Sequence, residues 1–68
     1  MPTFHHSLMT RLDKSTYGGR NLTPAHSAIR RALREANMKG RQFANLDELL
    51  THIRTFSRLP AETIKAAA

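Results

Sequence analysis

The chain has 68 residues with 11 Lys and Arg against 5 Asp and Glu, a formal net charge of +6, and no cysteine. This length predicts a single small domain over residues 1–68 and excludes a nucleotide-binding α/β sheet, while the lack of cysteine excludes disulfides and thiolate metal sites. No stretch approaches ~18 consecutive apolar residues, and residues 1–14 lack the pattern of a secretory signal. We therefore expect a cytoplasmic protein without a membrane partner.

The N-terminal segment, residues 1–21, is expected to be partly ordered. Its large apolar residues recur every four positions, at Phe4, Leu8 and Leu12. This spacing favours a short helix from about Thr3 to Asp13, followed by a loop over residues 15–21, because Gly18-Gly19 is a strong helix breaker. The alternative is a strand near residues 14–17, which would make the chain a dimeric ribbon-helix-helix protein that reads the major groove of DNA.

A helix is predicted over residues 24–38. Thr23 is a favourable N-cap, and Pro24 suits the first helical position, where a missing N–H costs nothing. Gly40 marks the end. The apolar residues follow three- and four-residue steps and form one stripe: Ala25, Ala28, Ile29, Ala32, Leu33 and Ala36.

A second helix is predicted over residues 46–58. Asn45 is a favourable N-cap with Glu48 three residues later, as in a capping box, and Pro60 ends the helix. Its apolar residues also have helical spacing: Leu46, Leu49, Leu50, Ile53 and Phe56. We expect residues 22–58 to form an antiparallel helical hairpin with Phe43 folded over it, and residues 59–68 to form a frayed turn or short helix. The predicted fold class is thus a small all-α domain.

The net charge is concentrated in residues 11–41, which hold eight Lys and Arg against two Asp and Glu. Such a segment is typical of proteins that bind a polyanion. At about 100° per residue, three arginines fall opposite the apolar stripe of the 24–38 helix. The predicted nucleic-acid-binding residues are these three and two cations beyond the helix end: Arg30, Arg31, Arg34, Lys39 and Arg41.

The histidines do not have the spacing of a metal or catalytic site. His5 and His6 are adjacent, and His26 and His52 lie on different predicted helices. A structural zinc site needs four N or S ligands, and a nucleophile-elbow pattern is absent. We therefore expect no enzymatic activity, no metal, no cofactor and no small-molecule substrate.

Residues 22–56 resemble the C-terminal helical segment of insertion-sequence transposases of the DDE superfamily. In that family a Leu-Asn-Pro-x-Glu start opens a basic helix, and a Phe-x-Asn-Leu-Asp-Glu-Leu helix follows. The matching residues are Leu22, Pro24, Arg30, Arg31, Leu33, Arg41, Phe43, Asn45, Leu46, Asp47, Glu48, Leu49, Ile53, Arg54 and Phe56. His26 stands where the family has its catalytic glutamate, and Ile29 where it has a tryptophan. The resemblance thus implies a remnant without nuclease activity.

These patterns predict a small basic protein that binds duplex DNA, as a regulator or accessory factor from a mobile element. A homodimer is expected because an alanine-rich face buries little apolar area. The expected additional interface consists of Phe4, Leu8, Met9 and Leu12. The alternative is a non-enzymatic interaction module or inhibitor that docks on an acidic partner protein.

Overall fold

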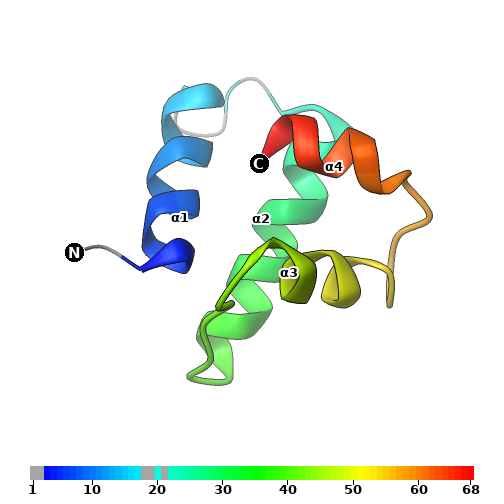
Figure 1. Cartoon of the computed structure of the whole chain (residues 1–68). Helices are drawn as coiled ribbons and strands as arrows, with labels where there is room; N and C mark the ends of the chain where they lie inside the picture. The colour runs from blue at the N-terminus through cyan, green and yellow to red at the C-terminus, as the bar shows by residue number, and fades with distance from the viewer. Residues whose placement is uncertain (1–2, 18–19, 21) are drawn as a thin grey trace.

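The computed structural model describes residues 3–17, 20 and 22–68, and within these ranges the chain is helical without any strand (Figure 1). The helices are α1 (Phe4–Ser15), α2 (Pro24–Met38), α3 (Leu46–Ile53) and α4 (Ala61–Ala67). The predicted all-α class is confirmed.

Helix α1 begins at a threonine cap, where the Thr3 hydroxyl accepts the His6 N–H at 3.1 Å. The helix confirms the prediction for this segment and runs two residues further than expected. The alternative strand near residues 14–17 is wrong, because residues 14–15 are helical and Thr16 and Tyr17 form a turn. The Thr16 hydroxyl donates to the Leu12 carbonyl at 2.8 Å, which supports this helical end. The predicted loop over residues 15–21 therefore begins one residue late, because Ser15 still belongs to α1, and residues 18, 19 and 21 of that loop lie outside the described residues.

Helix α2 has the predicted bounds because both ends are capped locally. The Thr23 hydroxyl accepts the His26 N–H at 3.2 Å, with Pro24 at the first helical position. At the other end Gly40 has a φ of 67°, its N–H donates to the Asn37 carbonyl, and the Arg41 N–H donates to the Ala36 carbonyl. These two bonds form a Schellman motif, which needs a left-handed residue at the position of Gly40.

Helix α3 starts as predicted but ends five residues early. The Asn45 side chain accepts the Glu48 N–H at 3.0 Å, and the Glu48 carboxylate accepts the Ala44 N–H at 3.4 Å. The His52 carbonyl accepts both the hydroxyl and the N–H of Thr55, at 2.7 and 3.1 Å. These hydrogen bonds span three residues instead of the four of an α-helix, which tightens the chain into a turn. The predicted end of the helix at residue 58 is therefore wrong.

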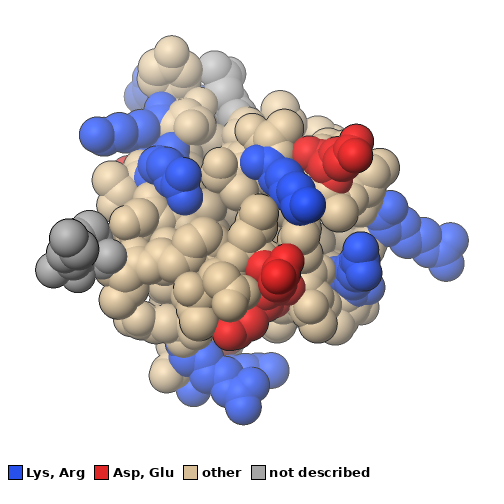
Figure 2. Space-filling model, in the orientation of Figure 1, with Lys and Arg blue, Asp and Glu red and all other residues tan. Residues whose placement is uncertain are grey.

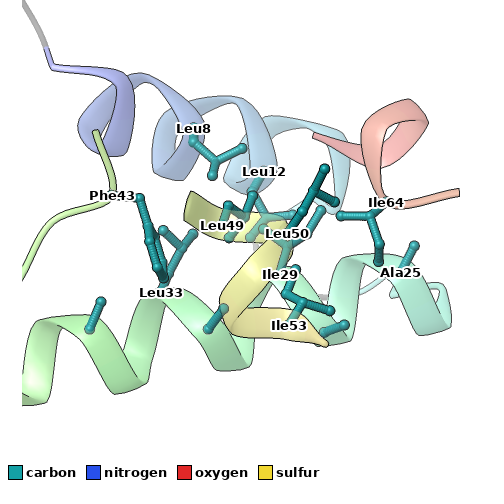
Figure 3. Close-up of a cluster of buried hydrophobic side chains, with 13 residues drawn as sticks. Leu8, Leu12, Ala25, Ile29, Leu33, Phe43, Leu49, Leu50, Ile53 and Ile64 are labelled. Atoms are coloured by element: carbon teal, nitrogen blue, oxygen red, sulfur yellow. The ribbon is translucent and has the colours of Figure 1, made fainter. Parts of the chain in front are cut away.

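Helix α2 is the centre of the domain, since α1, α3 and α4 all pack on it (Figure 1). Figure 3 shows side chains from all four helices converging in one core. The buried apolar residues are Leu8, Leu12, Ala25, Ala28, Ile29, Ala32, Leu33, Ala36, Phe43, Leu49, Leu50, Ile53 and Ile64. The core positions predicted for the two main helices are therefore correct, and Leu46 packs at the edge.

The predicted antiparallel hairpin is not what the helices form. Figures 1 and 3 show α3 crossing α2 obliquely instead of lying alongside it. The apolar stripe of α2 is shared among three helices, so the short α3 covers only part of it. The C-terminal segment, predicted as a frayed turn or short helix, forms α4, whose Ile64 side chain is buried in the core.

Most of the N-terminal apolar residues contribute to the core of the chain. Leu8 and Leu12 are buried against the other helices, and Phe4 packs partly against them. Met9 alone among the four expected interface residues is exposed. Because α1 docks within its own chain, Leu8 and Leu12 are not available to a second chain in this arrangement, and homodimerisation itself stays a prediction. None of the helices over residues 3–17 and 22–68 is long and apolar enough to cross a membrane.

Candidate nucleic-acid interface

The five predicted nucleic-acid-binding cations do not share one surface. Arg30 and Arg34 lie on the same side of α2, because residues four apart in a helix are neighbours. This side faces α1. Arg31 is turned toward α3, where it lies over a phenylalanine ring. Lys39 and Arg41 border a separate hollow beyond the end of α2. The three arginines thus lie outside the apolar stripe, as predicted, but on two different sides of α2.

A groove lies between α1 and α2, with a volume of about 820 Å³, and we call it the α1–α2 groove. Its lining combines cations and apolar side chains around one acidic residue. The cations are Lys14, Arg30 and Arg34, the apolar residues are Leu12, Leu33, Met9 and Met38, and the acid is Asp13. Met9 is 39% exposed and Met38 is 81% exposed. The groove thus has a cationic wall beside exposed methionines.

The three groove cations carry charge that the fold does not neutralise. Lys14, Arg30 and Arg34 are solvent-exposed, and none forms an ion pair with a carboxylate of residues 3–17, 20 or 22–68. Exposed cations without a partner attract an anionic ligand over a distance of about 8–10 Å at ordinary ionic strength. This part of the chain is accordingly where a polyanion would be attracted.

Arg31 has partners within the chain. Its guanidinium carbon lies 4.2 Å from the centroid of the Phe56 ring, and its Nε lies 3.8 Å from Glu35 Oε1. A guanidinium over an aromatic face is a cation–π contact. Although Arg31 lies outside the apolar stripe of α2, its guanidinium thus contributes to the packing of the domain. Arg31 joins α2 to the turn that follows α3.

Glu35 also binds His52, which lies on α3. His52 Nε2 donates to Glu35 Oε1 at 3.0 Å. This hydrogen bond is the main reason that the pKa of Glu35 is lowered, with Arg31, His52 and Lys39 adding favourable charge and burial opposing them. The lowered pKa keeps the Glu35 carboxylate ionised. Its Oε1 atom can therefore interact with both His52 and Arg31.

The hollow that Lys39 and Arg41 border is mixed in charge, because Asp47 and Glu48 line it as well. The face shown in Figure 2, which carries α3 and α4, is mixed too: Lys and Arg side chains lie in separate groups, with Asp and Glu among them. These surfaces are less suited to a polyanion than the α1–α2 groove.

His5 is a buried polar residue of α1. It is 2% exposed, its Nε2 lies 3.0 Å from Asn37 Oδ1, and its Nδ1 accepts the Phe43 N–H at 3.0 Å. An acceptor at Nδ1 requires a neutral ring with its proton on Nε2, which then donates to Asn37. The spacing of His5, Leu8 and Leu12 on one helical stripe was the signal for its burial.

The other histidines have separate structural positions. The Nδ1 atom of His26 lies 2.8 Å from the Thr23 hydroxyl oxygen at the start of α2. His6 is exposed on α1. Within residues 3–17, 20 and 22–68, no three His, Asp or Glu side chains are placed to hold a metal ion together.

Comparisons of the chain with protein-family models, curated proteins and solved structures find no match. The resemblance of residues 22–56 to transposases therefore stays a prediction. At the position of the family's catalytic glutamate, His26 lies beside the N-cap of α2.

Proposed function

We propose that the protein binds duplex DNA through the cationic wall of the α1–α2 groove. Lys14, Arg30 and Arg34 would contact phosphates, and Arg31 would stay in its contact with Phe56. The observation that carries this proposal is the grouping of three exposed, unpaired cations at one groove in a chain of net charge +6. Contacts to phosphate supply most of the affinity of sequence-independent DNA binding.

Titration of a fluorescent duplex over a salt series tests this proposal. Each phosphate contact adds about −0.9 to the slope of log affinity against log salt concentration. The double variant Arg30→Gln/Arg34→Gln is expected to reduce the magnitude of that slope by about 2. The charge-matched control is Arg54→Gln/Arg58→Gln, which removes two exposed arginines from outside the groove and should leave the slope close to the wild-type value.

Equal effects of the two double variants would show that net charge alone matters and would refute the assigned surface. A wild-type protein that does not bind duplex DNA at low salt would refute the proposal itself. Circular dichroism of each variant checks that its helix content is unchanged.

A partner protein is the second candidate, and the exposed methionines favour it. Met9 and Met38 beside Leu12 and Leu33 offer a flexible apolar floor, and the cations of the groove would pair with acidic side chains. An amphipathic acidic helix has this complementary pattern. Met9→Gln/Met38→Gln distinguishes the candidates, because it should weaken binding of an acidic helix strongly and binding of DNA little.

The remaining sequence predictions extend this proposal. A role as a regulator or accessory factor of a mobile element rests on the resemblance to transposases, and DNA as the partner favours a cytoplasmic location. Homodimerisation would need a surface other than the buried N-terminal leucines. Sedimentation with and without duplex DNA measures the oligomeric state.

A further inference from the structure

Three separate segments meet at the buried His5 ring. The ring belongs to α1, one nitrogen pairs with Asn37 near the end of α2, and the other accepts the N–H of Phe43 in the connector before α3. Phe43 also stacks on the ring, with centroids 5.7 Å apart. Both polar atoms of the side chain are therefore used to hold α1 in place.

We propose that His5 is a protonation-sensitive clamp: a second proton on its ring releases α1 from α2 and so takes apart the α1–α2 groove. Protonated Nδ1 becomes a donor and faces the Phe43 N–H, which is also a donor. The hydrogen bond is then lost, and two N–H groups are left opposed in a buried position. A buried donor without an acceptor is costly, so the docked arrangement is disfavoured.

The surroundings of the ring do not offset that loss. The groups that α2 turns toward α1 are Arg30 and Arg34, and the groove's one carboxylate, Asp13, lies two turns away on α1 itself. On the connector side His52 packs against the Phe43 ring with centroids 5.5 Å apart. The charged groups that line the hollow beside Phe43 are two cations and two carboxylates, Lys39, Arg41, Asp47 and Glu48. No carboxylate of residues 3–17, 20 or 22–68 is within ion-pair distance of His5.

The contact between α2 and α3 responds to acid in the opposite direction. His52 donates to Glu35 through Nε2, and a proton added to its ring strengthens the attraction to that carboxylate. Mild acid therefore weakens the attachment of α1 while the α2–α3 contact persists. The expected product is a domain with α1 released from α2 and with the α2–α3 contact kept.

This regulatory role rests on the proposed function in one respect: release of α1 affects DNA binding only if DNA binds in the α1–α2 groove, which needs both helices. The clamp itself is tested on the free protein. Amide hydrogen exchange, corrected for the intrinsic effect of pH, should show the protection of the Phe43 and Leu12 amides falling about tenfold or more between pH 7.5 and pH 5. The protection of amides in α3, such as Ile53, should change much less.

Two variants separate the clamp from general acid effects. His6→Gln removes the adjacent exposed histidine of the same helix and should retain the pH-dependent loss. His5→Gln keeps a polar side chain that does not titrate, and its protection should be lower than wild type at pH 7.5 and nearly constant down to pH 5. At pH 7.5, ¹⁵N spectra of the wild-type ring should show a proton on Nε2 and none on Nδ1.

Unchanged Phe43 protection at pH 5 would overturn the clamp, as would an equal loss of protection in all helices or a pH response abolished by His6→Gln. The DNA proposal is judged separately. If α1 is released at pH 5 while DNA affinity and its salt slope stay unchanged, the clamp stands and the groove is not the DNA site.

Discussion

His52 Nε2 lies 3.0 Å from Glu35 Oε1, and this hydrogen bond joins α3 to the face of α2 that also carries Arg31. The carboxylate thereby connects the cation–π contact on Phe56 with the aromatic packing around Phe43. Charged and aromatic groups at the edge of the core thus position α3, in addition to its buried leucines.

The Glu35 interaction predicts a stability that depends on pH. The His52 hydrogen bond lowers the pKa of Glu35 below its ordinary value of 4.5, so the ionised carboxylate stabilises the folded state above that pH. This contribution is lost as the pH falls through the lowered pKa of the folded protein. Urea unfolding should therefore show Glu35→Gln less stable than wild type at pH 6, with a smaller difference at pH 3. Glu62→Gln on α4 serves as the control, and a difference for Glu35→Gln that does not vary with pH would contradict the assignment.

Arg31 and Arg30 are expected to differ in stability although they are adjacent. Arg31→Gln removes the contact with the Phe56 ring and should lower the free energy of unfolding by about 0.5–1 kcal/mol. Arg30→Gln removes an exposed groove cation and should change it by less than about 0.5 kcal/mol. Chemical unfolding of both variants in the same buffer measures the difference. Equal effects would show that the guanidinium does not stabilise the fold through Phe56.

Leu8 should contribute to stability as a core residue of the single chain. Leu8→Ala is expected to lower the free energy of unfolding by about 2–5 kcal/mol, because the side chain is fully buried. Leu49→Ala should cost a similar amount. Met9→Ala, one position further along α1 and partly exposed, should cost much less. If Leu8→Ala instead changes only self-association and leaves the unfolding curve intact, α1 is not docked as described.

Gly40 tests the end of α2 without disturbing the packing. With φ at 67° and no atom within 4 Å of an added Cβ, Gly40→Ala meets only backbone strain. It should therefore lower the free energy of unfolding by about 1 kcal/mol. Gly40→Asn should cost less, since asparagine adopts the left-handed conformation more readily. Thermal unfolding of the two variants gives the order, and a reversed order would argue against the Schellman motif.

The features that depend on near neighbours could be predicted from the sequence. The caps at Thr23-Pro24, Gly40 and Asn45 use hydrogen bonds that span three to five residues, so the start and end of α2 and the start of α3 were predictable. The buried positions of these helices were predictable as well, because their period places one stripe inside. The premature end of α3 was missed, since Thr55 competes for the His52 carbonyl within a run that has helical spacing.

The partners of the polar side chains, in contrast, follow from how the helices pack on one another. Arg30 and Arg31 look equivalent in the sequence, yet one lines the α1–α2 groove and the other lies on Phe56, because α1 and α3 pack on different sides of α2. His5 gained its role in the same way, from Asn37 and Phe43 at 32 and 38 residues' separation. Helical periodicity specifies the side of a helix on which a residue lies. The element that packs there depends on long-range burial, to which all four helices contribute together.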